Sequence, residues 1–142
     1  MKIPQTLRSI VAQRANGCCE YCMTPEAYDN KSFSIDHIFP EVLGGLDDIE
    51  NYAHSCQGCN SVKYNKTVGR DPETGEIVVL FNPRQHKWTA HFRWNENFTV
   101  ILGLTPTGRA TIVSLRLNRE QLINQRIVFH VFGIHPPAHS IA

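Results

Sequence analysis

Four of the five cysteines of this 142-residue sequence form two closely spaced pairs. The first pair lies in Cys19-Glu-Tyr-Cys22 and the second in Cys56-Gln-Gly-Cys59, with 33 residues between them. Two residues between cysteines let one tight turn aim both thiolates at the same point, and two such turns complete a tetrahedral zinc site. Four thiolates leave no open coordination position, so the pattern predicts a structural Zn²⁺ that contributes to folding.

The same thiols have other interpretations. They are free thiols or disulfides if no metal binds, although a secreted disulfide scaffold typically follows a signal peptide. Residues 1–15 lack the continuous apolar stretch of such a peptide. Cys18 replaces Cys19 as a ligand only by giving up the two-residue spacing, so we expect Cys18 to be a small buried residue.

A second set of polar residues lies between the cysteine pairs and just after them. A neutral imidazole is a suitable general base near neutral pH, which makes His37 a candidate for activating a water molecule. The carboxylate of Asp36 and the amide oxygen of Asn60 are hard oxygen donors that suit Mg²⁺ or Mn²⁺. An ion with only two protein ligands keeps positions for phosphate oxygens and water, which suits phosphodiester hydrolysis.

Two further residues have supporting roles in this hypothesis. The Asn51 amide is expected to hydrogen-bond across the intervening loop and hold the His37 imidazole, although Asn51 taken alone is better explained as a turn residue. Lys63 lies one turn beyond Asn60 if residues 60–66 form a helix. In that position it either contacts phosphate as a point charge or is an ordinary solvated lysine.

The whole run of these residues resembles the HNH endonuclease family. It reads Cys-x-x-Cys, Asp-His-Ile, Gly-Gly, Asn, Cys-x-x-Cys-Asn and Lys over roughly residues 17–66, about a third of the chain. The resemblance implies metal-dependent cleavage of DNA on a ββα-metal finger. His37 would be the general base, Asp36 and Asn60 the metal ligands, and Asn51 the middle Asn of the family name.

The sequence departs from the family pattern at two places. The family often has His-His at the first motif position and His at the last, whereas this chain has Asp36-His37 and Cys59-Asn60. Both variants keep oxygen ligands on the ion, which favours Mg²⁺ over Zn²⁺ or Ni²⁺ as the catalytic metal.

Short elements must position these residues. The pattern predicts a helix over residues 6–15 that ends at Asn16-Gly17, and a strand over 32–38 that ends near the Asp-His pair. Residues 52–55 are expected to form a second short strand, and residues 60–66 a helix. The predicted fold class is α+β, with a ββα-metal core stapled by a four-cysteine zinc site.

The second half of the chain has a different character. Residues 68–142 contain no cysteine and no motif that indicates chemistry. The predicted features are a strand at 77–81, a hairpin of 88–94 and 98–104, a turn at 105–108, a helix opened by Asn118 and Gln121 as a capping box, and a frayed tail from His135. We therefore expect residues 1–67 to form the nuclease core and residues 68–142 a supporting extension, packed on it as one globular unit.

The segment Trp88–Trp94 mixes aromatic and basic residues, as nucleic-acid surfaces do. An amphipathic hairpin with its aromatic side chains in the core is the favoured interpretation. The second half is also similar, more loosely, to the tails of stand-alone bacterial HNH proteins through Phe81-Asn82-Pro83-Arg84 and Gly108-Arg109-Ala110-Thr111. That resemblance assigns no function.

Charge adds little to the functional hypothesis. The formal net charge is +1, and residues 68–142 hold eight Lys/Arg against five Asp/Glu, with five of the seven histidines. This mild excess suits either a phosphate-facing side or an ordinary surface. No apolar run is long enough to span a bilayer, so we expect a cytoplasmic protein that acts on DNA. Its oligomeric state, monomer or homodimer, stays open.

Three hypotheses follow, of which the first is favoured: an HNH endonuclease, a non-catalytic zinc-stapled DNA-binding or interaction module, and a purely structural zinc protein. A binding module has no need for Asp36, His37, Asn51 and Asn60 together. It would instead present a dense Arg/Lys face, which the first half of this sequence lacks.

Overall fold

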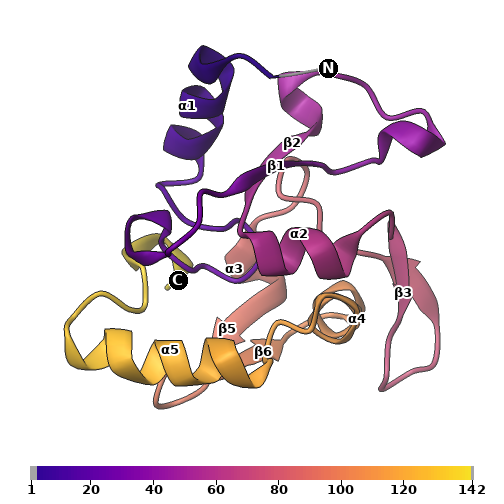
Figure 1. Cartoon of the computed structure of the whole chain (residues 1–142). Coiled ribbons are helices and arrows are strands. Elements are labelled where there is room, and N and C mark those ends of the chain that lie inside the picture. Colours follow the sequence, from indigo (N-terminus) through magenta and orange to yellow (C-terminus); the bar gives the residue numbers. More distant parts are fainter. Residues whose placement is uncertain (1–2, 142) are drawn as a thin grey trace. The chain divides into compact units, whose positions relative to one another are not determined.

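The computed structural model describes residues 3–141 and divides the chain into two compact units, residues 1–67 and 68–142 (Figure 1). Short helices alternate with two-stranded antiparallel sheets in the described residues, so the predicted α+β class is confirmed. No helix in this part of the chain is long and apolar enough to cross a membrane. The two units are described in turn.

The first unit opens with α1 (Gln5–Arg14), which buries Val11 and packs beside the second strand of the unit (Figure 1). The helix begins after Pro4, whose restricted φ suits a helix start. It ends before Asn16 and Gly17, which both adopt left-handed backbone angles, with φ of 54° and 71°. The helix stop predicted at Asn-Gly is confirmed, because these residues tolerate that conformation best.

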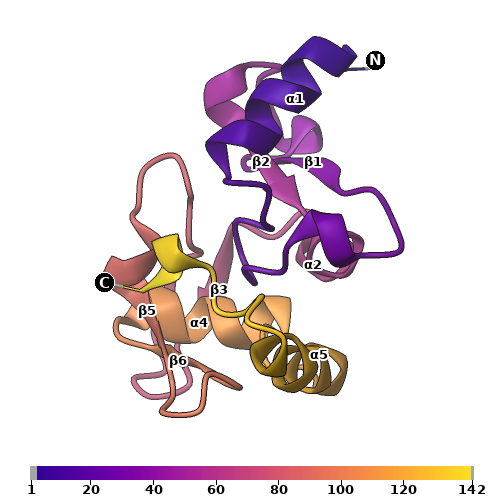
Figure 2. The same ribbon diagram turned by 90° about the vertical axis from the view of Figure 1, so that its left-hand side faces the viewer.

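The core of the first unit is a ββα arrangement. Strands β1 (Ser34–His37) and β2 (Tyr52–Ser55) pair antiparallel, with His37 opposite Tyr52 at the end of the hairpin. Helix α2 (Gln57–Lys63) follows and packs against β1 (Figure 2). It begins three residues earlier than predicted, because the Sγ atom of Cys56 accepts a hydrogen bond from the Cys59 amide and caps the helix.

Three short 3₁₀ segments complete the described part of this unit: η1 (Glu26–Tyr28), η2 (Glu41–Leu43) and η3 (Ile49–Asn51). Its interior holds few large apolar side chains. The buried set consists instead of small, aromatic and polar residues, including Cys19, Tyr21, Cys22, Phe33, Tyr52, Cys56, Cys59, Asp36 and Lys63. Thiols and a paired charge therefore occupy much of the interior that an apolar core fills in other proteins.

The second unit contains two hairpins. Strands β3 (Val68–Arg70) and β4 (Ile77–Val79) pair antiparallel, as do β5 (Phe92–Trp94) and β6 (Ile101–Gly103). The predicted strand over 88–94 is only partly right, because its first four residues form helix α3 (Trp88–His91). The aromatic side chains of this segment lie in the core: Trp88, Phe92 and Trp94 are all buried.

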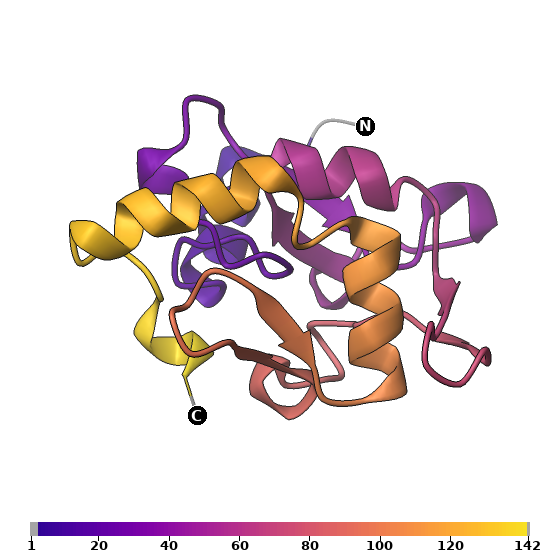
Figure 3. The same ribbon diagram turned by 90° about the horizontal axis from the view of Figure 1, so that it is seen from below.

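Two longer helices follow, and Figure 3 shows them running in different directions within the unit. Helix α4 (Pro106–Leu115) begins inside the segment 105–108, for which a turn was predicted; Thr105 caps the helix through the Gly108 amide, and proline occupies its first position. Helix α5 (Glu120–Val131) lies where a helix was predicted. Its predicted cap is wrong, because Asn118 instead exchanges hydrogen bonds with the backbone of Ile101.

The predicted frayed tail is also wrong for the residues that the structure describes. Residues Ala138–Ser140 form a short 3₁₀ turn, η4, and His135 and Ser140 are buried. The Trp94 indole N–H donates to Ser140 Oγ at 2.9 Å, and the His135 ring stands edge-on to the Trp94 ring. An indole N–H that is buried needs an acceptor, and the tail supplies it.

Candidate metal centres and active site

The two cysteine pairs meet in one buried cluster. The Sγ atoms of Cys19, Cys22, Cys56 and Cys59 all lie within 4.8 Å of one another, and the four cysteines form no disulfide. The Sγ atoms of Cys22 and Cys56 are 3.7 Å apart. A tetrahedral Zn²⁺ with Zn–S bonds of about 2.3 Å separates its sulfurs by about 3.8 Å. The four thiols therefore fit a structural zinc ion.

In each cysteine pair, a backbone amide also contacts one of the two sulfur atoms. The Cys22 amide donates to Cys19 Sγ at 3.5 Å, and the Cys59 amide donates to Cys56 Sγ at 3.4 Å. Hydrogen bonds to a thiolate favour its charged form, which is the form that binds metal. Hydrogen bonds from the neighbouring thiols, chiefly Cys19, lower the pKa of the Cys22 thiol, whereas burial raises the pKa of the Cys19 thiol.

Cys18 lies outside the cluster. It is buried, and burial raises the pKa of its thiol to about 11, with a further contribution from Cys22. The prediction that Cys18 is a small buried residue is therefore confirmed.

Asp36 and Lys63 form a buried ion pair between β1 and α2. Only 4% of Asp36 and 2% of Lys63 are exposed, and Lys63 Nζ lies 3.0 Å from Asp36 Oδ2. The Tyr21 hydroxyl donates to the same oxygen at 2.6 Å. Burial and the neighbouring Asp36 carboxylate raise the pKa of Tyr21, so this hydroxyl stays protonated and remains a donor.

Lys63 does not occupy the position that the sequence suggested. Both interpretations, a phosphate contact and a solvated lysine, required an exposed ammonium. The structure buries it, and Nζ also donates to the carbonyl oxygens of Ile38 at 3.1 Å and His37 at 3.4 Å. Lys63 therefore ties α2 to the end of β1. A phosphate contact by Lys63 finds no support in this arrangement, because the ammonium is enclosed by its own partners.

His37 is the last residue of β1, and its side chain is 17% exposed. Its Nε2 atom lies 2.8 Å from Asp47 Oδ1 and 3.5 Å from Glu41 Oε1. The ring of Tyr52, its partner across the hairpin, stands edge-on at a centroid distance of 5.2 Å. Two contacts thus restrict the imidazole, a hydrogen bond at one nitrogen and an aromatic ring beside it.

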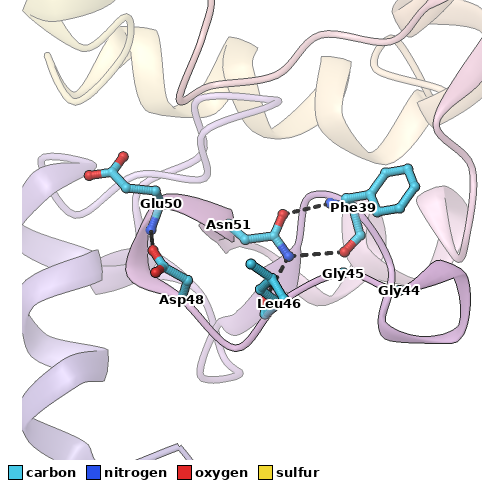
Figure 4. A pocket seen from close by; sticks show the side chains of 7 residues that line it. All are labelled: Phe39, Gly44, Gly45, Leu46, Asp48, Glu50 and Asn51. Atoms are coloured by element: carbon cyan, nitrogen blue, oxygen red, sulfur yellow. Dashed lines mark hydrogen bonds between the residues drawn. The ribbon is translucent and has the colours of Figure 1, made fainter.

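Asn51 closes the loop that carries these acids. Its Nδ2 atom donates to the carbonyls of Phe39 and Leu46, both at 3.0 Å, and its Oδ1 atom accepts from the Phe39 amide at 2.9 Å (Figure 4). The predicted bridge across the loop is present. The expected contact with the His37 imidazole is not among the interactions of the described residues, so Asn51 acts on the backbone that follows His37.

The glycine pair of the motif serves the same loop. Gly44 has a φ of 95°, a conformation that side chains rarely adopt. A Cβ atom at Gly45 would collide with the Phe39 carbonyl, while its amide donates to Pro40 O at 2.9 Å. Both glycines are needed to fold the segment back on itself. The same segment forms one wall of a pocket of about 490 Å³ (Figure 4).

A second, mostly polar pocket of about 290 Å³ contains the predicted reactive residues. Asp36, His37 and Asn60 all line it, and exposed Tyr64 lies at the end of α2 beside them. The structure thus brings the predicted base and both predicted metal ligands to one cavity. The remaining lining residues are Ile35, Pro40, Glu41, Val42 and Asn65.

The surroundings of His37 are negatively charged. Burial raises the pKa of Tyr52, and the nearby carboxylates of Asp47, Glu41 and Asp48 raise it further. Such a field attracts a cation. The carboxylate of Asp36 has four acceptor positions, of which Tyr21 and Lys63 use three. One position remains, and Asn60, whose amide offers a further oxygen donor, lines the same pocket.

Sequence reasoning missed three residues of this site. Glu41 and Asp47 lie beside the imidazole, and one ligand atom of each lies within 4.8 Å of the others and of a ring nitrogen of His37. Tyr21 contacts Asp36. Asp47 follows the glycine pair by two residues, so the loop that returns to His37 was a usable signal. Nothing in the sequence pattern indicated a role for Tyr21, which lies between Cys19 and Cys22.

The first unit thus combines a ββα core, a four-thiol cluster that fits zinc and a polar pocket lined by Asp36, His37 and Asn60. Residues 19–70 match the model of the family described as HNH endonuclease. No curated protein and no solved structure matches the chain. The family match ends at residue 70, and the resemblance noted for the second half stays a prediction.

Proposed function

We propose that the chain is a metal-dependent endonuclease that hydrolyses phosphodiester bonds of DNA. The observation that carries this proposal is the polar pocket lined by Asp36, His37 and Asn60, inside the segment that matches the HNH endonuclease family. A module that only binds DNA has no need for a base and two oxygen donors around one cavity.

In this proposal His37 is the general base. It takes the proton from a water molecule that attacks the phosphorus atom, and the bond from phosphorus to the 3′ oxygen then breaks. Asp36 and Asn60 would hold Mg²⁺ or Mn²⁺, and the ion would supply Lewis-acid stabilisation of the phosphate and of the leaving oxygen. The buried contacts of Lys63 and Tyr21 fix Asp36 in place. These contacts leave one acceptor position of the Asp36 carboxylate for the metal ion.

Asn51 has a supporting role. Its three hydrogen bonds hold the loop that begins directly after His37. A rigid loop keeps the imidazole and the acids beside it in one arrangement, which limits the reorganisation needed when substrate binds. The structural Zn²⁺ has no part in the chemistry, because four thiolates leave it no open position.

Plasmid cleavage tests the proposal. Zinc-loaded protein is incubated with supercoiled DNA and Mg²⁺ or Mn²⁺, beside a His37→Ala variant. His130→Ala serves as the control, since His130 is an exposed histidine on α5 in the other unit. We expect conversion to open-circle or linear DNA by the wild type and the control, and none by His37→Ala. Full activity of His37→Ala would remove the base assignment.

The main alternative is a zinc-stapled DNA-binding module. It predicts a folded, zinc-loaded protein that retards DNA in a gel and leaves it intact with either metal. Under that outcome the His37→Ala variant would bind DNA as the wild type does.

A further inference from the structure

The His37 imidazole has one close acidic partner. Asp47 Oδ1 lies 2.8 Å from His37 Nε2, well within hydrogen-bond distance. Glu41 Oε1 is 3.5 Å from the same nitrogen, and its side chain is 60% exposed against 40% for Asp47. Asp47 is therefore the group that determines how the ring is held.

The chemistry of the pair fixes which nitrogen carries the proton. An ionised carboxylate only accepts hydrogen bonds, so the Nε2 atom must donate to Asp47. A neutral imidazole has one N–H group, and its other nitrogen keeps a lone pair. With the proton on Nε2, the lone pair is on Nδ1 of His37, which is the nitrogen able to act as a base.

The loop is built to deliver this carboxylate. Asp47 lies ten residues after His37 and returns to it because the glycine pair and Asn51 fold the intervening segment back. The Tyr52 ring stands edge-on to the imidazole and restricts its rotation. Ring position and tautomer are therefore set by separate contacts.

We propose that Asp47 is a positioning residue that holds His37 as the Nε2–H tautomer and so presents Nδ1 as the general base. This inference rests on the proposed nuclease function for its catalytic consequence. Asp47 itself touches neither substrate nor metal in this proposal. It acts through His37, as the acid behind a histidine base does in other hydrolases.

The test compares Asp47→Asn with Asp48→Asn in the zinc-loaded protein. Both changes remove one negative charge from the same loop, but Asp48 contacts the Glu50 amide, and asparagine caps that turn equally well. An amide can donate or accept, so Asp47→Asn keeps the shape and loses the preference for one tautomer. The ¹⁵N spectrum of labelled histidine, assigned with His37→Ala, reports the tautomer at a pH where imidazoles are neutral.

We expect His37 to be the Nε2–H tautomer in the wild type and in Asp48→Asn, and a mixture in Asp47→Asn. The kcat for DNA cleavage should fall at least about tenfold in Asp47→Asn, part of the roughly 10²- to 10⁴-fold that a positioned base contributes. KM should stay within about twofold, because substrate binding is not altered. Zinc content and Tm should be those of the wild type.

Two results would overturn the inference: an Nδ1–H tautomer in the wild type, or the same His37 spectrum and kcat in Asp47→Asn as in the wild type. Failure of the proposed nuclease function would give a different result from failure of the Asp47 inference. A wild type that cleaves no DNA removes the catalytic role of His37, while the tautomer comparison still decides whether Asp47 positions the ring.

Discussion

The two units of this chain solve the problem of a stable interior in different ways. In residues 1–67 the buried side chains include the four thiols, the Asp36–Lys63 pair and the Tyr21 hydroxyl. In residues 68–142 they are mainly large apolar groups: Leu80, Phe81, Trp88, Phe92, Trp94, Ile101, Leu115, Leu117 and Leu122. The first interior is built largely from thiols and paired polar groups, and the second from apolar side chains.

The difference between the two interiors explains why the candidate reactive side chains lie in the first unit. A small finger cannot bury enough apolar surface to be stable alone, and a metal site replaces the missing core. The space then available near the surface accommodates a histidine, carboxylates and an amide around one pocket. The family match falls almost wholly in this first unit. We therefore expect perturbations of metal and charge to act on the first unit and perturbations of packing on the second.

The largest expected effect is loss of zinc. Replacing Cys56 with serine, or removing the metal with a chelator, should unfold the first unit, because a structural zinc site contributes on the order of 10 kcal/mol. Both tryptophans, Trp88 and Trp94, lie in the second unit and report on it separately. The circular dichroism signal of folded secondary structure should fall in part. The tryptophan emission maximum should stay at the wavelength typical of buried tryptophan.

Cys18→Ser is the matched control for this change, since Cys18 is a buried thiol outside the cluster. It should retain one zinc ion per chain. An unchanged melting curve for zinc-free Cys56→Ser would contradict a structural zinc site.

A smaller effect is expected from Lys63→Met. Removing this ammonium leaves the Asp36 carboxylate buried without its charge partner, which costs about 3–5 kcal/mol in comparable buried pairs. Denaturant unfolding followed by circular dichroism measures the change. Lys66→Met, at an exposed lysine three residues later, is the control and should alter stability little. Equal stabilities of the two variants would mean that the pair does not support the first unit.

The second unit has its own charge pair, whose stabilising contribution should be lost at acid pH. Arg109 donates two hydrogen bonds to Asp71, each at 2.9 Å, and they hold the pKa of Asp71 well below its usual range. A lowered pKa contributes stability that is present above the unfolded-state value, about 3.9, and is lost as pH falls further. Unfolding followed by tryptophan fluorescence should therefore show that the stability of the second unit declines below about pH 4.

Arg109→Leu should lower the stability of the second unit at neutral pH and flatten its acid dependence. Arg93→Leu, at an exposed arginine of the same unit, should do neither. If both variants keep the acid decline of the wild type, other groups cause it.

The sequence predicted the first unit better than the second, for a physical reason. Thiol spacing and the Asp-His pair carry chemistry in their order alone, so the zinc cluster and the hairpin of β1 and β2 were foreseeable. The burial of Lys63 was not, because it depends on how closely α2 approaches the end of β1. A lysine after a metal motif has the same local pattern whether it faces solvent or a buried carboxylate.

In the second unit, local signals competed. The Thr105-Pro106 pair is typical both of a turn and of a helix start, and in the structure it begins helix α4. Asn118 resembled a cap but pairs with Ile101, a contact between segments that no local pattern reveals. The order of the tail depends on Trp94, 46 residues before Ser140. Long-range partners of this kind decide what spacing alone leaves open.

The central claim is that Asp36, His37 and Asn60 surround the hydrolytic ion, apart from the zinc site. Paramagnetic broadening of backbone amide signals by Mn²⁺, titrated into zinc-loaded protein, tests it directly. We predict saturable broadening that is strongest at these three residues, and weaker Mn²⁺ binding with intact zinc content in Asn60→Ala. Broadening centred on Asp47 and Glu41 with a sharp Asn60 signal, or no saturable broadening, would contradict it.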